Sequence, residues 1–320
     1  MAPQDRGILN GAGGSPAEFE LTLPRGGNWK IGSRPALMGI LNCTPDSFSD
    51  GGRYGDVETA VGAACRMVED GADVVDVGGE STRPGADSVS LDEQLERVIP
   101  VILGIRQRSD VLVSVDTRDP GVGSAALEAG ADIINDVSAC EDPDWLPVLR
   151  DHDCPVVLMH MRGTPSNMQE DTSYPDGILN EICEFLEGRI GALATGGISR
   201  ERILVDPGIG FAKETGQNIE ILAGLRQLCG LGRPVLMGAS RKFFLGKILG
   251  DSSDRGRDPG QRDVATVAAN MIAVLNGASV LRVHNVPYTR DLIDVVEALR
   301  LETAGDLPQE ALQPSGGGGA

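Results

Sequence analysis

The sequence predicts a single-domain (β/α)8 barrel, the α/β fold also called a TIM barrel. Eight short, nearly continuous apolar runs alternate with longer stretches of helical apolar spacing, and this number of units favours a closed barrel over an open doubly wound sheet. Three of the helical stretches end alike, in Gly71-Ala72-Asp73, Gly130-Ala131-Asp132 and Gly277-Ala278-Ser279. Glycine can close a helix in the left-handed conformation before the chain enters a strand.

Each expected strand is apolar through its length, as is typical of parallel strands that are covered on both faces. In chain order the strands are expected at Ala36–Asn42, Asp73–Val77, Val111–Asp116, Asp132–Asn135, Pro155–His160, Arg202–Asp206, Val235–Gly238 and Ser279–His284. Helices are expected at Val57–Asp70, Leu91–Arg108, Pro120–Ala129, Ile178–Ala194, Ile219–Leu228, Val264–Asn276 and Thr289–Leu301. The element before the fifth strand, around Trp145–Arg150, has the weakest pattern.

Composition and charge exclude several classes of protein. The 320 residues contain 41% hydrophobic and 23% charged side chains, and no apolar run approaches the roughly 20 residues that span a bilayer. Lys and Arg total 28 against 47 Asp and Glu, a net charge of -19, which repels polyanions. We therefore expect neither a membrane nor a nucleic-acid partner, and an anionic substrate must be held by a few local cations or a divalent metal.

The cysteines indicate the cellular compartment, and the composition of the two ends of the chain indicates the limits of the domain. The six cysteines are scattered without a C-x-x-C pair, which indicates reduced thiols and a cytoplasmic protein. The first residues lack the basic stretch and apolar run of a secretory signal. Residues 1–27 and 303–320 are too poor in apolar side chains to be expected to order themselves, which leaves residues 28–302 for the barrel.

Polar residues stand where the expected strands end, and in a barrel all carboxyl ends of the strands meet on one face. Capping of the following helices is an alternative reading, but it does not suit the cationic members. Asp76 lies inside a strand, so we interpret it as a buried structural hydrogen-bond partner outside the main site. The residues at the strand ends are Asn42, Asp116, Asn135-Asp136, His160, Asp206, Ser240-Arg241-Lys242, Arg282 and His284.

The chemistry of this set fits a flat heterocycle beside a phosphate. A carboxylate at Asp206, exposed by the Pro207-Gly208 turn, can accept two parallel hydrogen bonds from a 2-amino-4-oxo pyrimidine. Asn135 offers a donor and an acceptor, and Lys242 could meet the ring carbonyl. Arg282 and His284, two positions apart on one strand, point to the same side and suit a phosphate.

Two polar loops follow the first and second strands. Residues 43–52 and 81–85 are rich in Gly, Pro, Ser and Thr, and we predict that they close over a substrate and exclude water. A passive, solvated connection is the alternative for either loop.

Eight long motifs occur in one order along the chain. They are Met38–Gly52, Asp76–Gly85, Ser114–Thr117, Ile134–Asp136, Met159–Met161 with Gly163–Pro165, Asp206–Phe211, Ser240–Lys242 and Arg282–His284. Together they closely resemble the dihydropteroate synthase family of pterin-binding enzymes, and the resemblance extends from about Pro35 to Leu301.

The resemblance implies condensation of 6-hydroxymethyl-7,8-dihydropterin pyrophosphate with 4-aminobenzoate, in a magnesium-dependent and commonly dimeric transferase. By motif, Asp116, Asn135, Asp206 and Lys242 would hold the pterin. Asn42, Arg83, Arg282 and His284 would meet the pyrophosphate, with Mg2+ on Asn42 and Asp46 supporting the metal site. Thr82, Pro84, Phe211 and Lys242 would frame 4-aminobenzoate. In the implied mechanism Arg83, Arg282 and His284 stabilise the leaving group, and Asp116 steadies the positive ring.

The sequence departs from the family pattern at two positions, and two other functions compete with the synthase interpretation. Phe243 stands where some members of the family have Ser, and Asn285 replaces a common Asp. One rival is a pterin-binding methyltransferase that serves a corrinoid partner, and the other is a catalytically silent paralogue. The loop motif at Thr82-Arg83-Pro84 and the Arg282-Val283-His284 segment argue against the methyltransferase, because methyl transfer has no pyrophosphate to hold.

Overall fold

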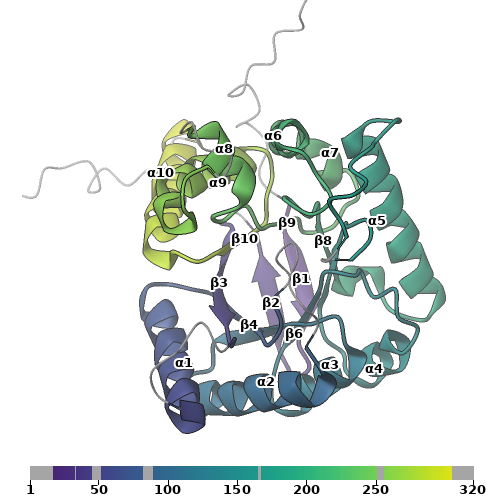
Figure 1. The fold of residues 1–320 in the computed structure, drawn as a ribbon, viewed down its shortest axis with the longest axis vertical. Coiled ribbons are helices and arrows are strands. Elements are labelled where there is room, and N and C mark those ends of the chain that lie inside the picture. Colours follow the sequence, from purple (N-terminus) through teal and green to yellow (C-terminus); the bar gives the residue numbers. More distant parts are fainter. Residues whose placement is uncertain are drawn as a thin grey trace, which may run out of the picture.

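A computed structural model describes residues 17–32, 34–44, 52–81, 89–164, 167–250 and 256–304. Its centre is a sheet of eight parallel strands, and helices surround this sheet on the outside (Figure 1). The order in the sheet is β8-β7-β6-β5-β4-β3-β10-β9. The two outer strands approach each other through a bridge between Val205 and Val235, with the Val205 N–H donating to the Pro234 carbonyl at 3.0 Å. This contact makes the sheet a nearly closed barrel, as predicted.

The elements follow the predicted alternation along the described chain. The barrel strands are β3 (Ala36–Asn42), β4 (Val74–Gly78), β5 (Leu112–Asp116), β6 (Ile133–Asp136), β7 (Val156–Met159), β8 (Ile203–Asp206), β9 (Leu236–Met237) and β10 (Val280–Val283). The helices are α1 (Gly52–Glu69), α2 (Leu91–Arg106), α3 (Pro120–Glu128), α4 (Trp145–Asp151), α5 (Ile178–Thr195), α6 (Thr215–Gly224), α7 (Arg226–Cys229), α8 (Phe243–Ile248), α9 (Asp263–Leu275) and α10 (Val286–Ala304).

Two helical details differ from expectation. The helix predicted at Ile219–Leu228 begins earlier and is divided into α6 and α7, and the short α8 was not expected. The weak element is a real helix, α4, because Trp145 at its start is fully buried and anchors it.

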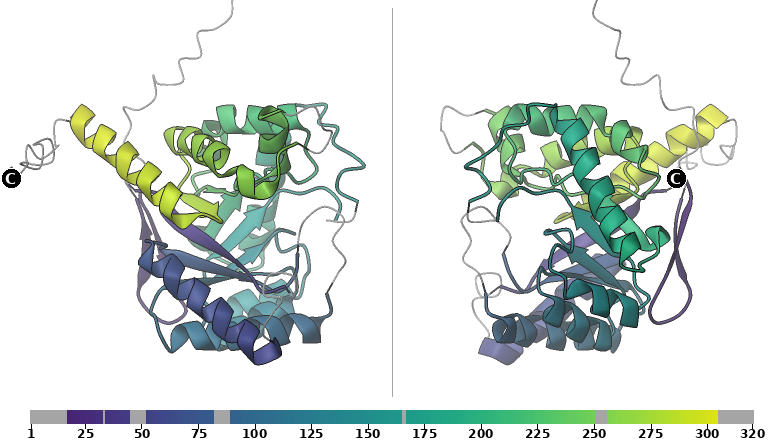
Figure 2. Two further views of the ribbon diagram at one scale, coloured as in Figure 1. Left: turned by 60° about the vertical axis from the view of Figure 1, so that its left-hand side comes forward. Right: turned by 90° about the vertical axis from the view of Figure 1, so that its right-hand side faces the viewer.

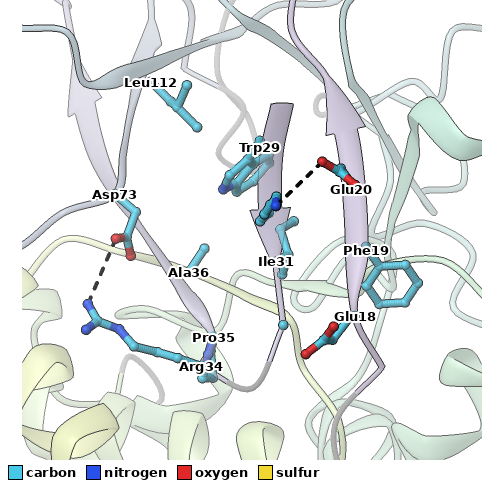
Figure 3. Close-up of a pocket in the computed structure, with 12 residues that line it drawn as sticks. Glu18, Phe19, Glu20, Trp29, Ile31, Arg34, Pro35, Ala36, Asp73 and Leu112 are labelled. Atoms are coloured by element: carbon cyan, nitrogen blue, oxygen red, sulfur yellow. Dashed lines mark ion pairs between the residues drawn. The ribbon is translucent and has the colours of Figure 1, made fainter. Parts of the chain in front are cut away.

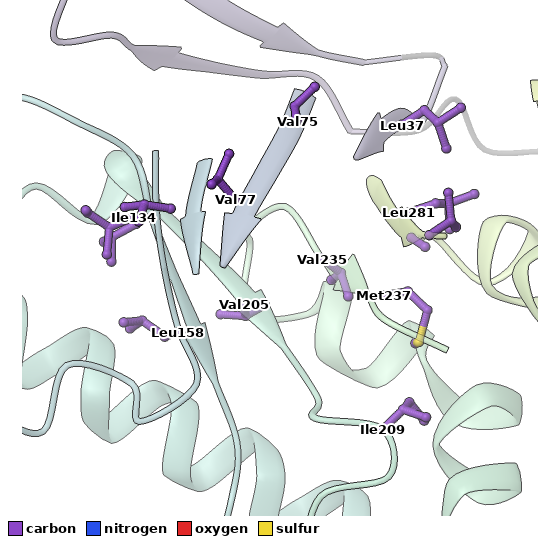
Figure 4. Close-up of a cluster of buried hydrophobic side chains, with 14 of the residues drawn as sticks. Leu37, Val75, Val77, Ile134, Leu158, Val205, Ile209, Val235, Met237 and Leu281 are labelled. Carbon is purple, nitrogen blue, oxygen red and sulfur yellow. The ribbon is translucent and has the colours of Figure 1, made fainter. Parts of the chain in front are cut away.

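The strands are buried on both faces, as their apolar runs predicted. One set of side chains packs outward against the helices, including Leu37, Val75, Val205 and Leu281 (Figure 4). The alternate set, which includes Met38 and Val157, fills the barrel interior.

An antiparallel hairpin, β1 (Phe19–Thr22) with β2 (Asn28–Ile31), lies against the amino-terminal ends of the barrel strands (Figure 2). Leu21, Trp29 and Ile31 pack into the interior cluster of the barrel. The prediction that residues 1–27 do not order themselves is therefore wrong from Phe19 onward. The hairpin has only a short apolar face, which becomes stable by covering the open end of the barrel.

A hollow lies where this hairpin meets the barrel (Figure 3). Glu20 and Trp29 line it from the hairpin, and Asp73 and Leu112 line it from the barrel. Arg34 and Asp73 form an ion pair across it at 3.9 Å.

The three Gly-Ala-Asp/Ser junctions share one geometry. Gly71, Gly130 and Gly277 have φ of 96°, 106° and 99°, the left-handed conformation predicted for a helix that closes before a strand. Each glycine thus ends its helix and turns the chain toward the next barrel strand.

No helix among the described residues has the length and apolar character that crossing a membrane would need.

Candidate active site

The carboxyl ends of the strands gather predicted site residues around one small cavity. Its lining comprises Asn135, Val137, Met159, Asp206, Gly208, Ile209, Phe211, Gly238, Lys242 and Arg282. These residues come from β6, β7, β8, β9, β10 and the segments that follow them, so the barrel topology brings together positions that are far apart in the sequence.

Arg282 on β10 is held by two buried carboxylates. Its Nε donates to Asp76 Oδ2 at 2.6 Å, and its Nη2 donates to Asp116 Oδ2 at 2.6 Å. Burial raises the pKa of Asp116 to about 7, and the charge of Arg282 opposes this rise. Burial alone would lower the pKa of Arg282, but Asp76 and Asp116 outweigh it and raise the value. The guanidinium is therefore a permanent cation with a fixed direction.

Asp76 is a buried hydrogen-bond partner, as interpreted from the sequence, and the two residues that it holds line the cavity. Besides Arg282, its Oδ2 accepts a hydrogen bond from Asn135 Nδ2 at 3.2 Å. This bond orients the Asn135 amide and uses one of its two N–H donors, which leaves the carbonyl oxygen and the second N–H for a ligand. A charged residue in the middle of an apolar strand was the available sequence signal, because burying a carboxylate is costly without a partner.

The Asp206 carboxylate is fixed by its own turn. Its Oδ1 accepts the Gly208 N–H at 2.6 Å. Gly208 has φ +68°, and an added Cβ would lie 2.0 Å from the His160 carbonyl oxygen, so only glycine fits. Burial raises the pKa of Asp206, while the Gly208 N–H and the cations Lys242, Arg282 and Lys213 oppose that rise.

Lys242 and Phe211 both line the cavity, with Lys242 Nζ 3.9 Å from the centre of the Phe211 ring. The preceding residue, Arg241, has φ +56°, an unusual conformation for a side chain with a Cβ. Its N–H donates to Thr266 Oγ1 at 3.0 Å, and its guanidinium binds both carboxylate oxygens of Asp263 at 2.6 and 2.9 Å. This network fixes the turn that presents Lys242.

His284 and Asn285 are tied to the same turn. His284 Nδ1 lies 3.0 Å from Ser240 Oγ, and the His284 N–H donates to that oxygen at 3.1 Å. Asn285 Nδ2 donates to Asp263 Oδ2 at 3.1 Å. The change from the family's Asp to Asn285 therefore replaces a carboxylate that would face Asp263 with a hydrogen-bond donor.

Helix capping does not account for the polar strand ends. Ser90 caps α2 and Asp119 caps α3 with their side chains, so Asp116 is not a cap. Asp136 has the structural role, because its carboxylate accepts the N–H groups of Ser138 and Cys140 at 2.7 and 2.8 Å. His160 does not line the cavity, and its Nδ1 lies 2.9 Å from Lys213 Nζ.

Asn42 ends β3 with a half-buried side chain. Four further predicted site residues, Asp46, Thr82, Arg83 and Pro84, lie outside the described residues. Phe243 begins α8 with half of its surface exposed, and Lys247 Nζ lies 5.4 Å from its ring centre.

Fold and site together define a (β/α)8-barrel enzyme whose pocket brings together carboxylate, amide and cationic side chains. A family model described as pterin binding enzyme matches residues 38–284. The dihydropteroate synthase of Synechocystis is 45% identical over 269 residues, covering 84% of this chain and 91% of that relative. The Escherichia coli enzyme is 42% identical over 266 residues, covering 83% and 92%.

Solved structures agree with these relatives. Yersinia pestis dihydropteroate synthase in a sulfonamide complex superposes with a TM-score of 0.81 at 42% identity, covering 88% of this chain and 99% of that one. Xanthomonas albilineans dihydropteroate synthase with 4-aminobenzoic acid gives 0.80 at 44% identity, covering 90% and 99%. The chain belongs to the pterin-binding enzymes and, within them, to the dihydropteroate synthases, which are transferases.

Proposed function

We propose that this enzyme joins 6-hydroxymethyl-7,8-dihydropterin pyrophosphate to 4-aminobenzoate and releases pyrophosphate. The observation that carries the proposal is the single cavity that holds Asn135, Asp206, Lys242, Arg282 and Phe211. Structures of the Xanthomonas albilineans relative are described with 4-aminobenzoic acid and with 7,8-dihydropteroate, which supports the same substrates here.

The pterin would lie between the acidic and amide groups of the cavity. Asp206 would accept two N–H bonds from the ring amidine, and the Asn135 carbonyl oxygen would accept a third. Lys242 would donate to the ring carbonyl. Asp116 Oδ1 is buried without a hydrogen-bond partner among the described residues, so a ring N–H would satisfy it.

The leaving group would meet the cations at the end of β10. No described residue is bonded to Arg282 Nη1, which leaves that N–H2 group for a phosphate oxygen, while Nε and Nη2 hold Asp76 and Asp116. His284 stands two residues farther along. Arg83 would join them from its loop.

A magnesium ion fits as a companion of the substrate rather than in a protein cage. Among the described residues no group of three His, Cys, Asp or Glu side chains could hold a metal. Mg2+ is commonly bound by one or two protein oxygens together with substrate phosphates and waters, and the Asn42 amide oxygen supplies such a donor, with Asp46 in support. When bound, the ion would neutralise charge on the pyrophosphate.

The residues act by positioning and electrostatics, and no enzyme nucleophile is needed. Electron donation from the dihydropterin ring would break the bond between the methylene carbon and the pyrophosphate oxygen. The arylamine would then attack the cationic methylene and lose a proton. Arg282 and His284 would stabilise the departing negative charge, and the carboxylate of Asp116 would stabilise the positive ring. Phe211 and Lys242, with Thr82 and Pro84, would frame 4-aminobenzoate.

We further propose a cytoplasmic homodimer that forms through α9 and α10. Five large apolar side chains on these helices are exposed, namely Val264, Met271, Tyr288, Val295 and Leu299. All six cysteines are free thiols, which supports a reducing compartment.

The test is an assay of purified protein with the pterin pyrophosphate, 4-aminobenzoate and Mg2+, with dihydropteroate measured by chromatography. We expect product that depends on all three additions. Pterin binding without product would identify a silent paralogue and overturn the proposal.

A further inference from the structure

Lys213 is a buried cation bonded to a residue of the cavity, and no step of the proposed chemistry uses it. Its side chain is only 4% exposed. Its Nζ lies 2.9 Å from the Phe211 carbonyl oxygen, 3.2 Å from the His160 carbonyl oxygen and 2.9 Å from His160 Nδ1. One ammonium group therefore joins the segment after β8 to the end of β7.

The protonation state of the His160 ring decides which group donates in its contact with Lys213. It packs edge-on against Phe185, with ring centres 5.1 Å apart. Burial, reinforced by the charges of Lys213 and Arg162, lowers the pKa of His160 to about 2. The imidazole is thus neutral, so its Nδ1 can accept while the Lys213 ammonium donates.

The segment that Lys213 holds carries four residues of the cavity, including Asp206 and Phe211. Asp206 begins it and Phe211 lies near its end. Between them Gly208 packs against the His160 carbonyl oxygen, and an added Cβ would also lie 3.3 Å from Lys213 Nζ. Loss of the ammonium would leave both the Phe211 and the His160 carbonyl without this donor, on either side of the packed turn.

The charge of Lys213 also acts on the site. Burial raises the pKa of Asp206, and Lys213 opposes this together with Lys242 and Arg282. Lys213 itself has a pKa lowered to about 7 by burial and by the neighbouring cations Lys242 and Arg162, against the attraction of Asp206. Below about pH 7 it therefore carries a positive charge that favours the ionised form of Asp206.

We propose that Lys213 is a positioning residue for pterin binding, which fixes the Asp206–Phe211 segment to β7 and supplies positive charge behind the Asp206 carboxylate. This inference rests on the proposed function, in which ionised Asp206 accepts the pterin N–H groups.

The test compares Lys213→Met with a matched control, Arg202→Met. Arg202 is another buried cation on main-chain carbonyls, with bonds of 2.8 and 2.7 Å to Leu149 and His152, but it lies at the opposite end of β8. Both variants lose a buried charge and its carbonyl bonds, and only Lys213→Met loses them beside the cavity. Circular dichroism and thermal unfolding establish that each variant is folded at the assay temperature.

The readouts are the KM for the pterin pyrophosphate and the pH profile of kcat/KM. For Lys213→Met we expect the KM to rise by about 10-fold or more, the cost of roughly one charged hydrogen-bond partner. Because Asp206 then gains its proton more readily, the acidic limb of the kcat/KM profile should move to higher pH. Arg202→Met should lower the melting temperature, keep the KM within twofold of wild type and leave the acidic limb in place.

The outcomes separate the two proposals. If wild-type protein forms no dihydropteroate, the proposed function fails before any variant is compared. If wild type is active, the role of Lys213 is overturned by a folded Lys213→Met whose KM and acidic limb are unchanged. It is overturned equally if Arg202→Met shifts the limb to the same extent.

Discussion

Among single residues, Arg282 shows how buried partners hold the groups of the site in place. Its guanidinium donates one hydrogen bond to Asp76 and one to Asp116, each at 2.6 Å. The same Asp76 orients Asn135, so one buried carboxylate couples the groups proposed for the pterin to the cation proposed for the pyrophosphate. Removing the whole guanidinium would leave two buried carboxylates without their cation, which typically costs about 3–5 kcal/mol.

Arg282→Lys is therefore a better test of Arg282 than Arg282→Ala. The lysine keeps the charge but cannot bind Asp76, Asp116 and a phosphate in a planar fork. We expect kcat to fall by about 100-fold or more, the usual cost of one preorganised partner of a developing charge. Steady-state kinetics measure kcat, and urea unfolding should show a larger loss of stability for Arg282→Ala. Wild-type turnover in Arg282→Lys would contradict the assigned role.

Gly208 gives a second prediction, based on backbone conformation. Gly208→Ala places a Cβ 2.0 Å from a main-chain oxygen at φ +68°, so the turn that carries Asp206 must move. We expect a loss of about 2–4 kcal/mol in the free energy of unfolding and a large rise in the KM for the pterin substrate. Gly216→Ala is the control, since nothing lies within 4 Å of its added Cβ, and a helical Gly→Ala change is stabilising by about 0.5–1 kcal/mol. Equal behaviour of the two variants would refute the argument.

At the scale of elements, the third residue of each Gly-Ala-Asp/Ser junction binds the neighbouring strand. Asp73 accepts the Leu37 N–H at 2.7 Å, Asp132 accepts the Val113 N–H at 2.9 Å, and Ser279 Oγ accepts the Val235 N–H at 3.3 Å. The junction therefore closes a helix with its glycine and aligns the next strand with its side chain.

Asp132 also attaches the hairpin to the barrel. It is fully buried and accepts from Arg25 at 2.7 Å and from Arg106 at 2.5 Å. Asp132→Ala should lower the free energy of unfolding by about 3–5 kcal/mol, because it leaves Arg106 and the Val113 N–H without their partner. Chemical denaturation measures the loss. Asp110→Ala, an exposed carboxylate in the same region, should change stability by less than about 0.5 kcal/mol, and a similar effect of both variants would count against the buried network.

At the scale of the whole molecule, the sequence predicted the barrel and the residues at its mouth because both depend on local patterns. Apolar runs of strand length and left-handed glycines locate the strands, and barrel topology then places Asp116, Asn135, Asp206 and Arg282 on one face. The partners of these residues depend on three-dimensional packing. Neither Asp76 between Arg282 and Asn135 nor Lys213 behind Asp206 follows from spacing along the chain.

The hairpin was missed for a related reason. Its alternating apolar residues, Leu21, Trp29 and Ile31, are too few to form a core by themselves. Their burial depends on the barrel end that they cover, and that surface exists only after the strands have closed.

The proposed dimer is the prediction that concerns the whole molecule. Each copy carries a net charge of -19, so two copies repel each other unless salt screens the charge, while burial of the apolar face of α9 and α10 favours association. We expect sedimentation to show a dimer that becomes tighter from 0.05 to 0.5 M NaCl, about the range over which the Debye length falls below 10 Å.

Val295→Asp, at a side chain that is 59% exposed, should weaken the dimer at least 10-fold without unfolding the monomer. Leu91→Asp, at an exposed leucine on α2, is the control, and a dimer that responds equally to both substitutions would place the interface elsewhere.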